Sequence, residues 1–458
     1  MSVKDLIHTT RALPGGGEVF VLNTGAVIGP EAEAMLQALH SRSVGGLRAH
    51  LEKLAKSGAE KFMSMFYVGY GHKSIGDCAS VTLFIEGVSM LAAKAIQDFM
   101  LYNGQEASTR YIDFATQKFL DPHGTANTQE IQENWRDCYL QGLVAVKEAL
   151  LAQHPRQPDE KEDVHAKAIN ARAFDVMRWA LPCGATTNLA WHGELRHIAD
   201  HLDRLRHHPL AEVQNIALAL EDALNEKYPS SFQKKRYEAT EAYVAEYMQM
   251  EYYFNTPHPA WPMLRSVSGD FSGMNIGRLT RYRNLLETRP KQTELPKFLA
   301  ECGTAQFEYM LDFGSFRDNQ RHRAVIQRMP LATVDYGIGD WYLQQLPERF
   351  AEKVLPFIRQ QFGRIKRLSC SDEVRQYYVP MGALVTCQLT GDLPALVYLV
   401  ERRARMDVHP TMRNVALHIG TLLQFHYSAL GLKLYMEQQQ DRFHYKRGEQ
   451  DIVEKQTA

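Results

Sequence analysis

The chain contains the segment Arg204-Leu205-Arg206-His207-His208-Pro209 and, 201 residues later, the segment Arg405-Met406-Asp407-Val408-His409-Pro410. Each has an arginine four residues before a histidine, and a proline directly follows the histidine. An earlier pair stands in the same order, RSVGG at residues 42–46 and RSVSG at residues 265–269. One repeat at about half the chain length indicates tandem domains rather than an array of short repeats.

A third pair, Leu181-Pro182 and Val379-Pro380, lies between the other two. Each match is short enough to arise by chance, so the inference depends on their common order. The offset falls from 223 to 201 residues because the first half contains an extra polar segment at residues 154–161 (HPRQPDEK), which is typical of a surface loop. The polar, proline-punctuated residues 255–259 (NTPHP) are expected to link the two halves.

At 458 residues the chain is too long for one ordinary domain. We therefore predict a first half at residues 1–235 and a second half at residues 255–458. Hydrophobic residues at 45% and charged residues at 23% are typical of a folded globular protein. The net charge of -1 provides no overall field that would attract nucleic acid or a membrane, so any anion site must be local.

The six cysteines are scattered without a C-x-x-C pair, which argues against a structural zinc site or a disulfide framework and fits a reducing compartment. The first residues lack the apolar core of a signal peptide. The longest apolar stretch, residues 81–96, is interrupted by Glu86 and Lys94. We therefore expect a cytoplasmic protein with no membrane or nucleic-acid partner.

The residue pattern predicts an α+β fold in each half, with a small sheet under several long helices. Strands are indicated by β-branched and aromatic runs, and helices by apolar residues at helical spacing. The predicted strands are residues 19–22, 80–85 and 305–310, and the predicted helices are residues 131–152, 213–226, 237–252 and 412–426.

The first half carries QEASTRY at residues 105–111, after GHKS at residues 71–74 and a predicted strand. Glu106, Ser108 and Arg110 occupy alternate positions, so their side chains project together if the segment is extended. Such a trio can hold a ribose hydroxyl and a phosphate, because arginine makes charge-assisted and often bidentate contacts. A polar turn with one salt bridge is the commoner arrangement for such residues, and spacing alone leaves both open.

The second half carries RDNQRHR at residues 317–323. Arg321 and Arg323 flank His322, and such an arrangement could bind a nucleotide phosphate or the electron-rich edge of a flavin. A solvated basic face is the alternative interpretation.

Together these segments resemble the flavin-dependent thymidylate synthases, whose signature is R-H-R followed by N-E-x-S-x-R-Y. Here that signature is split between the halves. The first half keeps QEASTRY but has Asp98-Phe99-Met100 where the R-H-R would fall, and the second half keeps the R-H-R without the rest. The family's arginine four residues before a proline is retained as Arg178, whereas Gln376 stands at that position in the second half. The family's R-x-D-x-H stretch is intact at residues 405–409.

The resemblance implies two tandem thymidylate-synthase-complementing-like domains, each a small, mostly antiparallel sheet packed with long helices. Active sites in this family lie between the subunits of a homotetramer. Here two halves are fused, and each lacks motif segments that the other retains. The resemblance therefore implies a homodimer that mimics a tetramer, with composite sites built from both halves.

The implied activity is FAD-dependent methylation of dUMP to dTMP, with methylene-tetrahydrofolate and NADPH as co-substrates and without a metal. The implied substrate-binding residues are Glu106, Ser108, Arg110, Arg178 and Asp318. The implied cofactor-binding residues are Arg321, His322, Arg323 and His409. Arg321, which would bridge nucleotide and flavin, and Arg405, which would face the pyrimidine, are the implied catalytic residues.

Two positions depart from the family pattern. Asp318 replaces a glutamine and cannot donate to a uracil carbonyl, so another pyrimidine nucleotide is an alternative substrate. Cys78 stands where the family has a flavin-contacting histidine. A non-catalytic protein that binds flavin or nucleotide is the third possibility.

His409 precedes Pro410, so we expect a helix to break at this histidine. A histidine at such a break can reach a ligand or cap the carbonyl groups of its own helix. Both roles remain open from the sequence.

Overall fold

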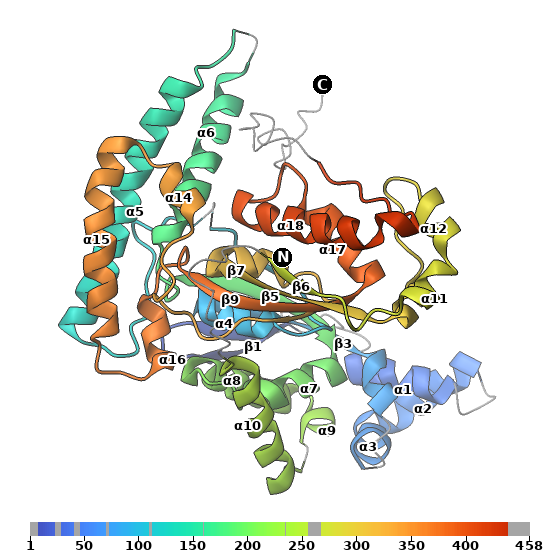
Figure 1. Cartoon of the computed structure of the whole chain (residues 1–458). Helices are drawn as coiled ribbons and strands as arrows, with labels where there is room; N and C mark the ends of the chain where they lie inside the picture. The colour runs from blue at the N-terminus through green and yellow to red at the C-terminus, as the bar shows by residue number, and fades with distance from the viewer. Residues whose placement is uncertain are drawn as a thin grey trace. The chain divides into compact units, whose positions relative to one another are not determined.

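A computed structural model describes residues 8–22, 29–40, 46–69, 73–109, 112–158, 160–233, 235–254 and 267–437, and every structural statement below concerns these residues. The chain forms two compact units (Figure 1). The first unit comprises residues 1–108, 118–120 and 185–251, and the second comprises residues 109–117, 121–184 and 252–458. Among the described helices, none is long and apolar enough to cross a membrane.

The first unit is built on an antiparallel sheet of five strands in the order β1-β2-β3-β5-β4. The strands are β1 (His8–Ala12), β2 (Glu18–Leu22), β3 (Ser80–Ser89), β4 (Asn103–Glu106) and β5 (Thr186–Glu194). Val81, Leu83 and Ile85 of β3 are buried and alternate with more exposed residues, as expected for a strand with one face on a core.

Helices α4, α7 and α8 contact the strands of this sheet. Every residue of α4 is buried, and Lys94 is compensated by Asp98 at 2.7 Å between Nζ and Oδ2. The helical segments of the unit are α1 (Pro30–His40), α2 (Gly46–Ser57), α3 (Glu60–Phe62), η2 (Met63–Gly69), η3 (Lys73–Cys78), α4 (Met90–Gln97), α7 (Leu195–Leu205), α8 (Ala211–Lys227), α9 (Pro229–Phe232) and α10 (Glu238–Tyr252).

The second unit contains a four-stranded antiparallel sheet in the order β6-β7-β9-β8. Its strands are β6 (Ser268–Asp270), β7 (Thr304–Asp312), β8 (Ile326–Arg328) and β9 (Leu384–Asp392). This order repeats β2-β3-β5-β4 of the first unit. Strands β5 and β9 both have 9 residues, and the helices that follow them both have 11.

The pairing register is also repeated. Ser80 lies opposite Glu194, and Thr304 lies opposite Asp392. Strand β3 has one residue more than β7 because its register shifts between Ile85 and Val88, where Gly87 has a φ of 66°. This β-bulge accommodates an extra residue without changing the partners at the strand ends. The two sheets are therefore copies of one topology.

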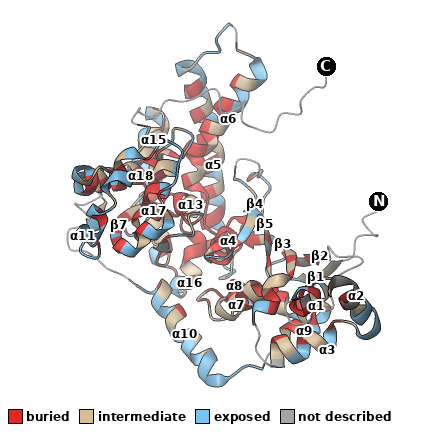
Figure 2. Ribbon diagram, turned by 90° about the vertical axis from the view of Figure 1, so that its right-hand side faces the viewer, coloured by how far each residue is buried: buried red, intermediate tan, exposed pale blue. Residues whose placement is uncertain are grey.

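Three long helices of the second unit, α5, α6 and α15, pack side by side (Figure 1). In Figure 2, α13 and α5 contain many of the buried residues of this unit. Its helical segments are α5 (Ala126–Gln153), α6 (Glu162–Met177), η4 (Arg178–Ala180), α11 (Ile276–Thr280), α12 (Arg283–Thr288), η5 (Lys297–Cys302), α13 (Phe313–Asn319), α14 (Asp340–Gln344), α15 (Glu348–Lys366), α16 (Asp372–Arg375), η6 (Gln376–Tyr378), α17 (Leu393–Arg403), α18 (Pro410–Tyr427) and η7 (Ser428–Leu430).

Two segments that match in sequence meet inside the second unit, where Pro182 and Pro380 form an antiparallel bridge. The Cys183 amide donates to the Val379 carbonyl at 2.8 Å, and the Met381 amide donates to the Leu181 carbonyl at 2.7 Å. The two bonds are equivalent, because Cys183 and Leu181 lie 198 residues before Met381 and Val379 in the sequence. We call residues 179–184 and 377–382 the proline junction.

The junction has a second pair of equivalent hydrogen bonds. The Gly184 amide donates to the Tyr377 carbonyl, and the Gly382 amide donates to the Trp179 carbonyl, both at 3.0 Å. Trp135 of α5 packs edge-on against Trp179. The segment that begins with Arg178 is therefore fixed to the second half of the sequence by backbone bonds and by an aromatic core.

The predicted α+β class, with antiparallel sheets packed with helices, is confirmed. The predicted strands correspond to β2, β3 and β7, and the predicted helices to α5, α8, α10 and α18. Residues 154–161 connect α5 and α6, as expected for a loop. The predicted linker at residues 255–259 lies outside the described residues. The division at residues 1–235 and 255–458 concerns sequence repetition and stays a prediction.

Gly382 tests the junction, because an added Cβ would lie 2.3 Å from Cβ and 2.9 Å from Cα of Trp179. We expect Gly382→Ala to lower the free energy of unfolding by about 1–3 kcal/mol, the usual cost of overpacking. The control is Gly277→Ala in α11, where the nearest contact is an ordinary 3.5 Å. It should raise stability by roughly 0.5–1 kcal/mol, since alanine favours a helix. Urea unfolding followed by tryptophan fluorescence measures both, and equal stability of Gly382→Ala and wild type would contradict the prediction.

Candidate functional site

A cavity of about 500 Å³ in the second unit gathers most of the residues that the sequence singles out there. Six of the predicted site residues line the cavity, together with five other residues. The predicted residues are Arg178, Asp318, Arg321, His322, Arg405 and His409, and the additional ones are Tyr398, Arg402, Arg403, Asp407 and Val408. We call this space the arginine cavity. Its five arginines outnumber its two aspartates, so its charge suits an anionic ligand.

Arg178 begins η4, and its side chain is 12% exposed. Its Nε donates to the Tyr342 hydroxyl at 3.2 Å, and its Nη2 donates to Ser315 Oγ at 2.6 Å. The buried Asp312 lies 4.0 Å from Nη2. Burial by itself lowers the pKa of Arg178, but the combined electrostatic effect of Tyr342, Asp312 and neighbouring aspartates raises it above its ordinary value. The cavity wall therefore holds a permanent cation.

Asp318 lies on α13, and Arg321 follows that helix. Asp318 Oδ1 is 3.8 Å from Arg321 Nη2. Burial by itself raises the pKa of Asp318, but the charges of Arg178, Arg321 and Arg403 together lower it below its ordinary value. Asp318 is therefore ionised at neutral pH and can only accept hydrogen bonds.

His322 accepts a hydrogen bond from Arg403, with 2.7 Å between its Nε2 and Arg403 Nε. Burial, followed by the charges of Arg403 and Arg402, lowers the pKa of His322 to about 3. The ring is therefore neutral, and its proton lies on Nδ1 because Nε2 is an acceptor. This Nδ1 is buried and has no hydrogen-bond partner among the described residues. His322 thus contributes an N–H donor rather than a charge.

Arg405 forms a two-point pair with Asp407, at 3.0 and 3.2 Å, and its side chain is 45% exposed. Arg402 lies over the ring of Tyr398, 5.3 Å from the centroid. Both arginines come from the end of α17 or the loop after it. Their partial exposure leaves them accessible to a ligand in the cavity.

His409 stands at the N-cap of α18, so the expected helix break is confirmed. Its Nδ1 accepts from the Thr411 hydroxyl at 2.8 Å and from the Thr411 amide, and its Nε2 donates to the Asp175 carbonyl at 3.2 Å. The idea that it caps the carbonyl groups of its own helix is wrong. Burial and nearby Arg178 lower the pKa of His409 well below its ordinary value. A neutral ring offers an acceptor, which the free amides at a helix start require.

Four other predicted residues are not among those that line the arginine cavity. Arg323 lies in the loop between α13 and β8. Glu106 ends β4 and accepts a hydrogen bond from Gln97 at 2.7 Å, and Ser108 is exposed just beyond that strand, both in the first unit. Arg110 lies outside the described residues. The combined projection of Glu106, Ser108 and Arg110 therefore stays a prediction.

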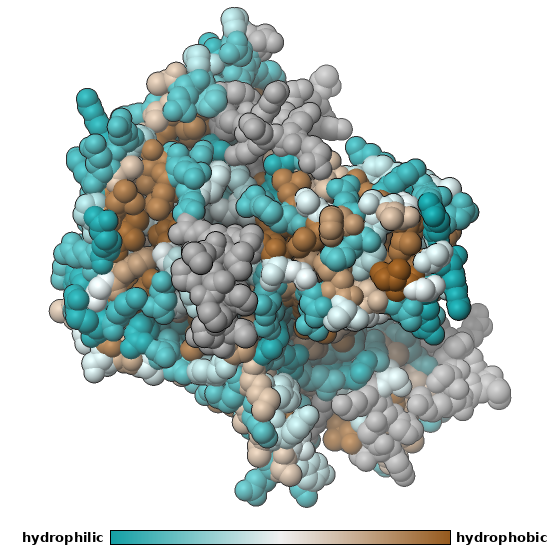
Figure 3. Space-filling model, viewed as in Figure 1, coloured by the Kyte–Doolittle hydropathy of each residue, from teal (hydrophilic) through white to brown (hydrophobic). Residues whose placement is uncertain are grey.

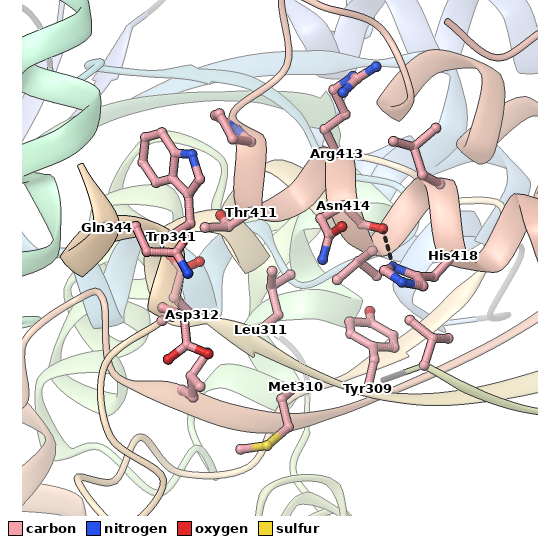
Figure 4. Close-up of a pocket in the computed structure, with 17 residues that line it drawn as sticks. Tyr309, Met310, Leu311, Asp312, Trp341, Gln344, Thr411, Arg413, Asn414 and His418 are labelled. Atoms are coloured by element: carbon pink, nitrogen blue, oxygen red, sulfur yellow. Dashed lines mark hydrogen bonds between the residues drawn. The ribbon is translucent and has the colours of Figure 1, made fainter. Parts of the chain in front are cut away.

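A second cavity of about 420 Å³ lies within the same unit, between β7, α14 and α18 (Figure 4). Asp312, Trp341 and Thr411 lie on one side of it, and Tyr309 and His418 lie on the other. Arg178 and His409 line the arginine cavity, whereas their partners Asp312 and Thr411 line the second one. The ion pair of Arg178 with Asp312 and the hydrogen bond of His409 with Thr411 therefore form part of the wall between the two cavities.

Sequence reasoning missed two kinds of residue. Arg402 and Arg403 are separated from the R-x-D-x-H stretch by Ala404 alone, so the local density of arginine was a usable signal. Ser315, Tyr342 and Thr411 carried no comparable signal, since single hydroxyl residues occur throughout the chain. Among the described residues, no group of three or more histidines, cysteines or acidic residues could hold a metal ion.

Comparison with known proteins finds a family model that matches part of the chain. Residues 29–230 match the model of the family described as "Thymidylate synthase complementing protein". A "UPF0159 protein" of Chlamydia muridarum is 25% identical, and the match covers 84% of this chain and 86% of that protein. A relative with the same family name from Thermoplasma acidophilum is 22% identical, over 83% of this chain and 89% of its own length.

A third relative, from Chlamydia pneumoniae, is 24% identical over 82% of this chain and 84% of its own length. Alignments of this extent must reach beyond residues 29–230, so the similarity to these proteins includes the second half. The region that matches the family model contains Arg178, whereas the R-H-R segment lies after it. Residues 29–230 are thus similar to the thymidylate synthase complementing proteins, the family of FAD-dependent thymidylate synthases.

Proposed function

We propose that the protein methylates dUMP to dTMP in an FAD-dependent reaction that uses methylene-tetrahydrofolate and NADPH. One observation carries the proposal. The three arginines that the family resemblance assigns to the nucleotide, Arg178, Arg321 and Arg405, come from distant parts of the sequence and line one cavity. Arginines at random surface positions would not be expected to line the same cavity.

The residues of the arginine cavity fit phosphate-bearing ligands, because guanidinium groups form paired hydrogen bonds with phosphate oxygens. The volume of about 500 Å³ lies within the usual range of about 300–1,000 Å³ for small-molecule sites. Arg178 would hold the nucleotide phosphate, and Arg321 and the buried N–H of His322 would hold the flavin. We also propose that the second half forms the second thymidylate-synthase-complementing-like domain that the resemblance implies.

Reduced flavin supplies the hydride when it is bound, and the residues of the chain bind and orient the reactants. Arg405 would face the pyrimidine ring, where a cation stabilises negative charge that develops at the transition state. Its pairing with Asp407 at 3.0 Å fixes the plane of the guanidinium group before a ligand arrives.

A second candidate is flavin-dependent C5-alkylation of another pyrimidine nucleotide, and Asp318 supports it. This carboxylate is ionised by its arginine neighbours, so it can accept from a ring N–H or an amino group but cannot donate to a carbonyl. A panel of dUMP, UMP and dCMP distinguishes the two candidates.

We also propose that the active assembly is a homodimer that mimics a tetramer. The first half retains QEASTRY and the second half retains the R-H-R, so each site would join residues 105–111 to residues 321–323. Apolar side chains of α5 and α15 are exposed, with Val144 at 58% and Leu355 at 42%. Figure 3 shows brown, apolar surface near α15, and such patches favour association.

The reaction is tested with purified protein, NADPH, methylene-tetrahydrofolate and dUMP labelled with tritium at carbon 5. We expect a yellow protein with flavin absorbance that releases tritium into water, because methylation replaces the hydrogen at that carbon. A yellow protein that acts on UMP or dCMP instead would select the second candidate. A colourless protein without tritium release would contradict both.

Arg321 and Arg178 are assigned to different ligands, so their variants should differ. We expect Arg321→Ala to weaken FAD binding by about 1.5–3 kcal/mol, the usual loss of a charge-assisted hydrogen bond. Arg178→Ala should weaken dUMP binding by a similar amount and leave FAD nearly unchanged. Calorimetry measures both affinities, with Arg283→Ala on the exposed face of α12 as the matched control. If Arg178→Ala loses FAD and keeps dUMP, the assignment is wrong.

The assembly is measured by sedimentation velocity. We expect a species of twice the mass of one chain, since closed two-fold symmetry is the common solution for soluble oligomers. With one retained motif set per chain, the dimer should bind at most two flavins where an unfused tetramer binds four. A stable monomer that still turns over would exclude this assembly.

A further inference from the structure

Arg178 is held by two hydrogen-bonded arms that none of the predicted roles explains. One arm runs from Nη2 through Ser315 and Thr411 to His409, and the other runs from Nε through Tyr342 to Asp312. Ser315 and Asp312 are fully buried, as is Tyr342. These residues belong to β7, α13, α14 and α18, so four elements together hold a single guanidinium group.

The donor and the acceptor of each hydrogen bond in the first arm can be assigned from its last contact, which joins His409 to the Asp175 carbonyl. The Asp175 carbonyl can only accept, so His409 donates from Nε2 and its Nδ1 is an acceptor. Thr411 therefore gives its only hydroxyl proton to Nδ1 at 2.8 Å. The Ser315 hydroxyl must then donate to Thr411 at 2.5 Å, which leaves Ser315 Oγ as an acceptor for Arg178. Arg178 is the first donor of a one-way chain.

The second arm has the same polarity. Asp312 Oδ1 accepts from the Ser315 amide and from the Tyr342 hydroxyl, both at 2.9 Å. Because Tyr342 has only one hydroxyl proton, its oxygen can accept from Arg178 Nε. The Ser315 residue belongs to both arms, through its amide and through its hydroxyl. Nε and Nη2 are thereby fixed in one plane.

We propose that Ser315, Thr411, Tyr342 and Asp312 are positioning residues, which fix the Arg178 guanidinium so that Nη1 presents its two N–H bonds to a phosphate monoester in the arginine cavity. Nη1 has no hydrogen-bond partner among the described residues, and Arg178 lines that cavity. The inference rests on the proposed function for the identity of the ligand.

The physical reason is preorganisation. An arginine side chain is long and flexible, so an unsupported one loses rotamer freedom when it binds an anion. Here the rotamer is already selected, and the planar group can meet phosphate without reordering. A simpler role for these residues would be to neutralise the buried Asp312. That role requires the charge of Arg178 and the hydroxyl group of Tyr342, which donates to Asp312, but not the hydroxyl group of Thr411.

The test uses the full-length protein and two probes, inorganic phosphate and dUMP. We expect Thr411→Val and Tyr342→Phe each to weaken the binding of both probes by about tenfold or more, since a small misplacement of a binding group can cost about 100-fold. Flavin affinity should remain within about twofold, or about 0.4 kcal/mol, because the proposed function assigns the flavin to Arg321 and His322 rather than to Arg178. Thr411→Ser, which restores the hydroxyl, should bind as wild type does.

Two controls separate positioning from folding. Thr421→Val removes an exposed hydroxyl from the same helix, α18, and Tyr435→Phe removes a partly buried tyrosine hydroxyl that donates to the Arg289 carbonyl and does not line the cavity. Both should bind the two probes as wild type does. Melting temperatures of all variants identify any that fail to fold, and the affinity of each folded variant decides the question.

The outcomes are distinguishable. If wild type binds phosphate but not dUMP, the proposed function fails, and the phosphate affinities still test the positioning role. If wild type binds both and the Thr411 and Tyr342 variants bind equally well, the positioning role is overturned. Wild-type protein that binds neither probe would overturn both.

Discussion

The antiparallel pairing of two equivalent proline segments is the constraint on which the candidate site depends. Pro182 and Pro380 face each other, and backbone bonds on both sides lock the two segments in one register. Arg178 lies one residue before the first of these segments. Its guanidinium can therefore meet Tyr342 and Ser315, which lie more than 130 positions away in the chain. A shift of register by one residue would move Arg178 out of reach of both.

A substantial part of this arrangement could be predicted from the sequence. Strands such as β3 and β7 have alternating apolar residues, and long helices such as α5 and α18 have apolar residues at helical spacing, so local pattern is sufficient to find them. Arg178, Arg321 and Arg405 were identified through the resemblance to the flavin-dependent thymidylate synthases. The common order of the repeats indicated the copied topology of the two sheets.

The remaining features depend on contacts between distant residues. No pattern within residues 121–184 shows that they pack with the second half, because that choice is made by Trp135, Trp179 and the backbone of the proline junction. The donor directions around Ser315 and Thr411 follow only from the carbonyl that His409 meets. His409 itself was placed correctly at a helix break, but the sequence left its partner open, because burial and the neutral ring decide whether a histidine caps amides or carbonyls.

Residue Gln376 stands at the position equivalent to Arg178, and it has become part of the core. It is buried, and its Oε1 accepts from the Ala332 amide at 2.8 Å. In an assembly of identical chains a single codon specifies every copy of such a position, so no copy can lose its charge alone. Fusion gives each copy its own codon. Natural selection can then keep a cation at one position and a neutral hydrogen-bonding group at the other, and the two mutate independently from that point onward.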